Sequence, residues 1–279
     1  MLRTLLILAA GFIVVASAGV AGARPSCSAD WVCIEVVENG NSVDIFARNL
    51  QPYAVTVSLR ARIRNLLVGG QNPSTRTVTG HERVRLMRLS PVDDAQSWRY
   101  RYEYDWTVGS LSPRHDDTYL YRLPLAGTQS HKVLQGFSTG FTHNGLEEFT
   151  VDFDVPVGTP VYAAREGVVV RVEESNDRSC FGDGCGRYAN YVVILHPDGT
   201  TGEYYHLHKD GVLLEAGDPV HRGQKIGLSG NTGNSTMPHL HFGVYRADSW
   251  GRTQSLPVRF MTSRGVVDHP RSGRRYGVG

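Results

Sequence analysis

Residues 229–242 have the sequence SGNTGNSTMPHLHF, and the last four of them set the structural interpretation of the chain. His239 and His241 alternate with Leu240 and Phe242, which predicts a β-strand with one polar and one apolar face. Residues two apart on a strand project to the same side, so the two Cα atoms would lie about 6.5 Å apart at a rise of ~3.3 Å per residue. Two imidazoles placed in this way can bind one metal ion, or one can bind it while the other reaches a water on the metal.

The same alternation recurs in the first half of the chain. Strands are expected at residues 34–38, 43–47, 55–61, 84–89 and 98–104. No amphipathic helix pattern intervenes, so residues 24–125 are expected to form an antiparallel β-sandwich-like domain. The Trp and Tyr residues of 98–104 could form a carbohydrate-stacking face, as in a carbohydrate-binding module, but we favour packing between strands.

The second half of the chain is also rich in β-strand patterns. Apolar or alternating runs occupy residues 159–164, 167–172, 188–196, 203–208 and 239–245. The chain is therefore predicted to be all-β, with two domains joined near residues 122–131. Residues 259–279 carry several arginines among Gly and Ser, and we expect them to form a basic C-terminal tail.

Histidines are concentrated in the second domain, where seven of the eleven lie between His143 and His241. His206 and His208 form a second His-x-His pair on an expected strand. Asp152 lies within an apolar run, where a carboxylate usually needs a partner. Metal coordination would supply one, and so would a salt bridge to an arginine. The spacing alone therefore leaves both a metal site and a polar strand face open.

Four stretches in this region resemble the lysostaphin/LytM-type zinc metallopeptidases, which cleave peptidoglycan cross-links. They are residues 151–169, which contain VDF and GTPVYAA, residues 204–207, YYHL, residues 217–227, GDPVHRGQKIG, and residues 229–242. The stretches stand in the order found in that family. Residues 24–130 lie outside the resemblance.

The resemblance implies a groove-shaped antiparallel β-sheet domain over residues 131–258 and one catalytic zinc ion per chain. By position, Asp152 and His241 match zinc ligands, and His206 and His239 match the two catalytic histidines beside the metal. A site with three protein ligands and an open water position, flanked by general acid–base histidines, suits hydrolysis of peptidoglycan cross-links through a zinc-activated water. The implied partners are the peptide stems and cross-bridges of peptidoglycan.

The first zinc ligand departs from the common pattern of that family. Many members have a histidine four residues before the aspartate, but here that position is Glu148. His143 lies nine residues before Asp152, and we expect it to be the displaced ligand on an enlarged loop that contains Asn144-Gly145. The alternative is that Glu148 itself binds zinc.

An alternative function is a non-catalytic LytM-like regulator that binds and activates a cell-wall amidase. Degenerate members of this kind typically lack zinc residues, whereas His143, Asp152, His206, His239 and His241 are all present here. We therefore favour a zinc metalloendopeptidase.

The beginning of the chain resembles an export signal. A short positive start is followed by an apolar run and then by small residues, so residues 1–23 are expected to be a secretory signal peptide and the protein to be periplasmic or extracellular. Membrane contact is expected only if this segment stays uncleaved as an anchor. In such a compartment the close pairs Cys27/Cys33 and Cys180/Cys185 are expected to form two local disulfides. A structural zinc site of four thiolates is disfavoured, because neither pair has Cys-x-x-Cys spacing.

Composition excludes some other classes of function. The 279 residues are 41% hydrophobic and 20% charged, which is typical of a folded protein. The formal net charge of +2 gives no electrostatic field for nucleic acid or anionic lipid, so we expect no nucleic-acid partner.

Overall fold

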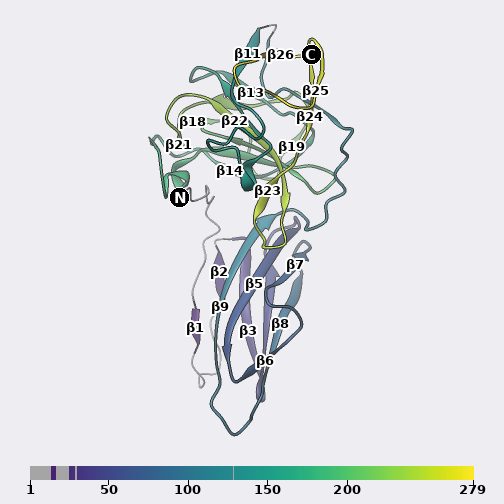
Figure 1. The fold of residues 1–279 in the computed structure, drawn as a ribbon, viewed down its shortest axis with the longest axis vertical. Helices are drawn as coiled ribbons and strands as arrows, with labels where there is room; N and C mark the ends of the chain where they lie inside the picture. The colour runs from purple at the N-terminus through teal and green to yellow at the C-terminus, as the bar shows by residue number, and fades with distance from the viewer. Residues whose placement is uncertain (1–13, 17–24, 29, 128) are drawn as a thin grey trace. The chain divides into compact units, whose positions relative to one another are not determined.

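The computed structural model describes residues 14–16, 25–28, 30–127 and 129–279 (Figure 1). The expected signal peptide, residues 1–23, lies outside these residues except for Val14–Ala16. The described residues divide into two compact units. The N-terminal unit contains residues up to Ser112 together with the segment Ala247–Thr253, and the C-terminal unit contains Pro113–Arg246 and Gln254–Gly279.

The N-terminal unit consists of two antiparallel sheets, which confirms the β-sandwich-like prediction. The strand orders are β1-β9-β5-β7 and β2-β3-β4-β8-β6. The first sheet contains β1 (Val14–Ala16), β9 (Arg99–Val108), β5 (Val55–Arg64) and β7 (Ser74–Val78). The second contains β2 (Ser26–Ser28), β3 (Val32–Asn39), β4 (Ser42–Asn49), β8 (Arg83–Pro91) and β6 (Leu66–Gly69).

The core of the N-terminal unit lies between its two sheets and follows the alternation in the sequence. On β9, Tyr100, Tyr102 and Tyr104 are at most 3% exposed, while Arg99 and Arg101, which point to the opposite face, are exposed. The tyrosines pack with apolar residues of β3, β4 and β5 in one cluster. The aromatic stripe of the sequence is therefore core packing, as we favoured.

The C-terminal unit is built on a nine-stranded sheet with the main order β19-β14-β16-β17-β22-β12-β11-β26, in which β23 also pairs with β22. The strands are β19 (Pro219–Val220), β14 (Gly167–Glu173), β16 (Tyr191–Leu195), β17 (Thr201–Tyr205), β22 (Leu240–Ala247), β12 (Thr150–Asp154), β11 (Ser130–Gln135), β26 (Arg275–Gly277) and β23 (Thr253–Ser255). Pairing from β19 to β26 is antiparallel. This agrees with the all-β prediction.

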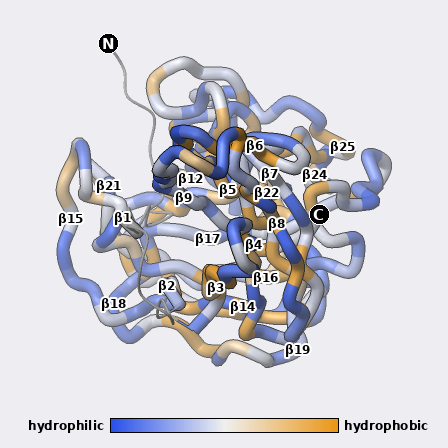
Figure 2. The backbone as a smooth tube through the Cα atoms, turned by 90° about the horizontal axis from the view of Figure 1, so that it is seen from below, coloured by the Kyte–Doolittle hydropathy of each residue, from blue (hydrophilic) through white to orange (hydrophobic). Residues whose placement is uncertain are grey.

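Smaller sheets and two short 3-10 helices complete this unit. The sheets are β10 (Leu120–Arg122), β24 (Arg259–Thr262) and β25 (Gly265–Val267); β13 (Pro160–Tyr162), β20 (Lys225–Ser229) and β18 (Leu207–Val212); and β15 (Ser179–Cys180) with β21 (Gly233–Asn234). The 3-10 helices are η1 (Gly145–Glu147) and η2 (Cys185–Tyr188). Figure 2 shows hydrophobic and hydrophilic residues succeeding one another along the chain.

Residues 259–279, which we expected to form a basic tail, are instead part of the C-terminal unit. β24 pairs with β10, and β26 pairs with β11 at the edge of the large sheet. Phe260 is buried against the core of the unit. The partners of these strands lie more than a hundred residues earlier in the chain, which is why local composition did not reveal them.

The large sheet has one apolar face and one polar face near its centre. β22 lies between β17 and β12. Leu240 and Phe242 of β22 pack in the core with Val151 and Phe153 of β12. The intervening residues face the other way, and there Asp152 of β12 stands directly opposite His241 of β22. This register places the first two residues of the candidate site next to each other.

Both expected disulfides are present. Cys27 and Cys33 bridge directly opposite positions of β2 and β3, and Cys180 is bonded to Cys185. Within the described part of the chain, no helix has the length and apolar character needed to cross a membrane.

Candidate metal centre

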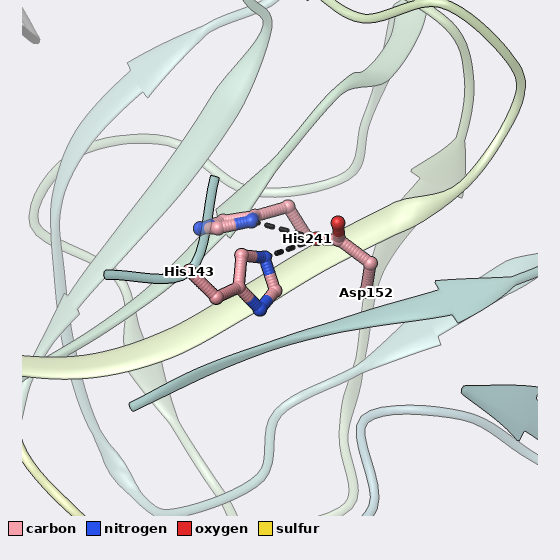
Figure 3. Close-up of side chains that lie close together, drawn as sticks. All are labelled: His143, Asp152 and His241. Atoms are coloured by element: carbon pink, nitrogen blue, oxygen red, sulfur yellow. Dashed lines mark hydrogen bonds and ion pairs between the residues drawn. The ribbon is translucent and has the colours of Figure 1, made fainter. Parts of the chain in front are cut away.

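Three side chains predicted as metal ligands converge on one point. Asp152 and His241 come from the paired strands β12 and β22. His143 comes from the loop before η1, and Gly145, the first residue of η1, adopts a φ of 59°. Their ligating atoms all lie within 4.8 Å of one another. Asp152 Oδ1 is 2.8 Å from His241 Nδ1 and 3.2 Å from His143 Nε2. Figure 3 shows both rings turned toward the carboxylate.

The proton positions of His143 suit a metal ligand. Its Nδ1 lies 3.1 Å from the carbonyl oxygen of Gly136, which can only accept, so Nδ1 carries the proton. Nε2 then keeps a lone pair that faces Asp152. This nitrogen is buried and has no hydrogen-bond partner among the described residues. A buried nitrogen lone pair beside a carboxylate oxygen fits a cation between them.

Electrostatics at Asp152 and His241 also favour a cation. Burial raises the pKa of Asp152, but the neighbouring imidazoles of His143 and His241 hold it well below its usual value. Burial alone would lower the pKa of His241, yet Asp152 and Glu147 raise it to about 10. Gln135 donates a 2.7 Å hydrogen bond to Asp152 Oδ2 and fixes the carboxylate. The site therefore favours positive charge, a proton or a metal ion, next to His241 Nδ1.

His206 and His239 form a second group beside these three. Their ring centroids are 4.5 Å apart, and His239 Nε2 is 3.8 Å from Asp152 Oδ1. Each Nδ1 donates to a backbone carbonyl, of Thr232 at 2.7 Å for His206 and of Met237 at 2.8 Å for His239. Each Nε2 is therefore left with a lone pair that can accept a proton. Burial, and then the charges of His239 and His241, lower the pKa of His206 to about 3.

All five predicted residues line a single pocket. Its lining also includes Phe141 and Phe181, which are 59% and 56% exposed and stack with their centroids 5.8 Å apart. Phe181 belongs to the loop closed by the Cys180–Cys185 bridge. The disulfide loop therefore contributes directly to the pocket wall.

Two other candidates lie away from the pocket lining. Glu148 accepts a 3.0 Å hydrogen bond from Ser138 Oγ and is not among the residues that line the pocket. His208 is exposed, because His206 takes a φ of 65° that interrupts the strand alternation between the two. The geometry thus favours His143 over Glu148 as a candidate metal ligand.

Sequence reasoning missed two buried residues behind His241. Tyr245 is fully buried and its hydroxyl lies 3.2 Å from His241 Nε2, and the same hydroxyl donates a 2.7 Å hydrogen bond to Glu147. Glu147 is only 4% exposed. Glu147 stands next to Glu148 at the end of a short helical turn, so no periodicity marked it. Tyr245 lies four residues after His241 on the same face of β22, and this spacing could have identified Tyr245 from the sequence.

Part of the chain matches a known protein family. Residues 147–253 match the family model described as Peptidase family M23. The chain carries a peptidase family M23 domain. The matched segment of the M23 domain contains Asp152, His206, His239 and His241, and it begins after His143.

Curated relatives of the M23 domain include named wall peptidases. Peptidoglycan DD-endopeptidase ShyA of Vibrio cholerae is 46% identical over 101 residues, which cover 36% of this chain and 19% of that protein. Glycyl-glycine endopeptidase ALE-1 of Staphylococcus capitis is 38% identical over 122 residues, covering 44% and 31%. Lysostaphin of Staphylococcus simulans is 35% identical over 149 residues, covering 50% and 28%. The match thus spans about a fifth to a third of these relatives.

Solved structures similar to this chain include the catalytic domain of lysostaphin from Staphylococcus simulans. It is 30% identical and covers 46% of this chain and 88% of that chain, with a TM-score of 0.33.

Proposed function

We propose that the protein is an exported, zinc-dependent endopeptidase that hydrolyses the peptide cross-links of peptidoglycan. The observation that carries the proposal is the convergence of His143, Asp152 and His241 in the pocket that also holds His206 and His239. The relatives named as peptidoglycan and glycyl-glycine endopeptidases support the same class of substrate.

The residues present fit a zinc ion. His143 Nε2, Asp152 Oδ1 and His241 Nδ1 would hold one ion per chain, and two imidazoles with a carboxylate are a usual ligand set for catalytic zinc. When bound, zinc supplies Lewis acidity, which lowers the pKa of water to about 7 and polarises a peptide carbonyl.

His206 and His239 would carry the proton transfers. The Nε2 atoms of both rings are unprotonated in the observed hydrogen-bond pattern, so either can accept a proton from the attacking water. The protonated ring can then pass the proton to the amine nitrogen that leaves when the peptide bond breaks. Donation of Nδ1–H to fixed backbone carbonyls keeps each ring in this orientation.

Export belongs to the proposal as well. Two disulfides are typical of proteins from oxidising compartments outside the cytoplasm. We therefore assign residues 1–23 to a signal peptide, residues 24–125 to an N-terminal β domain and residues 131–258 to the peptidase domain, with the protein in the periplasm or outside the cell.

Digestion of purified sacculi tests the proposal. The zinc-loaded protein should release fragments whose new amine and carboxyl ends, found by mass spectrometry, lie within peptide cross-links. A chelator should stop the release and added zinc should restore it. The same digestion is run with the variant His206→Ala. His208→Ala is its matched control, because His208 is exposed and lies outside the pocket lining. Intact sacculi after treatment with zinc-loaded protein would favour the amidase-activating regulator instead.

A further inference from the structure

Two buried residues that the proposed chemistry does not use, Tyr245 and Glu147, lie on the Nε2 side of His241. Its Nδ1 faces Asp152, whereas its Nε2 lies 3.2 Å from the hydroxyl of Tyr245. That hydroxyl donates a 2.7 Å hydrogen bond to Glu147 Oε2. Because the phenol proton goes to Glu147, the phenol oxygen is left to accept Nε2–H from His241.

The burial of Glu147 calls for an explanation. A carboxylate that is 4% exposed loses most of its hydration, and a phenol hydrogen bond alone replaces little of it. Glu147 Oε2 lies 3.8 Å from His241 Nε2, so its negative charge acts on the imidazole as well as on Tyr245. A cation at the other side of the ring would compensate this charge.

The backbone of β22 is adapted to this contact. His241, position 243 and Tyr245 lie on one face of the strand, and position 243 is glycine. A Cβ at Gly243 would lie 2.7 Å from Cε2 of Tyr245 and 2.8 Å from Cγ2 of Thr150. Glycine therefore leaves the room in which the Tyr245 ring lies back along the strand toward His241.

We propose that Tyr245 and Glu147 are positioning residues for the metal ligand His241. Glu147 orients the Tyr245 hydroxyl, which holds the Nε2–H tautomer of His241 and aims the Nδ1 lone pair at the metal position. The inference rests on the zinc site of the proposed function and adds how one of its ligands is fixed. Hydrogen-bond partners behind metal-binding histidines typically change metal affinity 10–100-fold when they are removed.

The same unit contains a matched pair that serves as a control. Tyr205 donates a 2.6 Å hydrogen bond to Glu203, which is also 4% exposed and also accepts from Thr201. The Tyr205 ring stands edge-on to His241 with centroids 6.0 Å apart, but its hydroxyl is directed to Glu203. This pair shares the chemistry and burial of Tyr245 and Glu147 without the hydrogen bond to His241.

The experiment compares zinc affinity, by chelator competition, in Tyr245→Phe and Glu147→Gln with that in Tyr205→Phe and Glu203→Gln. We expect about 10–100-fold weaker binding in the first two variants and less than about threefold change in the controls. The double variant Tyr245→Phe/Glu147→Gln should be little weaker than either single variant, because both act through one hydrogen bond. Imidazole nitrogen NMR of the zinc-loaded protein should show the Nε2–H signature of His241 in wild type and its alteration in Tyr245→Phe.

Thermal unfolding of the metal-free variants separates a folding defect from a loss of affinity. If the wild type binds zinc and all four variants bind it with equal affinity, the positioning role is overturned and the proposed zinc site remains. A folded wild type that binds no zinc would overturn the zinc site itself.

Discussion

The pocket contains two groups of side chains, the three proposed ligands around His241 and the pair His206 and His239. One histidine in each group, His241 and His206, has a pKa that its surroundings shift, and the two shifts run in opposite directions. His241 is bracketed by the carboxylates of Asp152 and Glu147, which raise its pKa to about 10. His206 is buried beside His239 and His241, and its pKa falls to about 3 although its hydrogen bond to the Thr232 carbonyl acts in the opposite direction. Residues of one type are thus prepared for two tasks, binding a cation and remaining a neutral base. Such separation of environments is a common way of assigning roles within an active site.

The largest effect is expected at the centre of the first group. Asp152→Ala removes the oxygen that both His143 and His241 face, so the variant should retain no zinc and show no wall hydrolysis above background. Zinc per chain is measured by elemental analysis after dialysis. Asp154→Ala, two positions along the same strand, is the control and should keep both properties. Full zinc occupancy in Asp152→Ala would remove this residue from the ligand set.

The second group should respond differently. His206→Ala and His239→Ala remove proton-transfer groups but none of the three ligands, so zinc should stay bound while the hydrolysis rate falls about 10²–10⁴-fold. Release of soluble peptide from sacculi measures the rate. A near wild-type rate in either variant would assign that histidine to structure alone.

The displaced ligand gives a third test. His143→Ala should lose zinc and activity together, because the carboxylate and His241 are left as the only two protein ligands of the proposed set. Glu148→Ala should keep both within a few-fold, since its side chain bonds to Ser138. The opposite pattern would make Glu148 the ligand.

His196 shows what burial does without a catalytic neighbour, and it gives the smallest expected effect. It is 2% exposed, and burial lowers its pKa from 6.5 to about 4. The unfolded chain therefore binds more protons than the folded one between these values, and stability should fall by about 3 kcal/mol as the pH drops from 6.5 to 4. His196→Gln should flatten this part of the pH profile, measured by denaturant unfolding of the metal-free protein. An unchanged slope would show that the pKa of His196 does not differ between the folded and the unfolded chain.

The strands and most of the site residues could be predicted from the sequence, but the contacts that join them could not. Alternation in residues 98–104 and 239–245 was enough to predict strands and the faces they bury. The pairing of Asp152 with His241 joins positions 89 residues apart, and only the resemblance to a known family linked them in advance. Glu147 reaches Tyr245 across 98 residues, and neither residue belongs to a stretch that carried the resemblance. The terminal strands were missed for the same reason, because their partners β10 and β11 are distant in sequence.

The most direct test of the division within the pocket uses the two histidines of the His-x-His motif. His239 and His241 are two residues apart, yet only His241 belongs to the proposed ligand set. Zinc content per chain, measured on folded His239→Ala and His241→Ala prepared side by side, should be about one in the first variant and near zero in the second. Equal zinc content in the two variants would contradict the separation of metal binding from proton transfer.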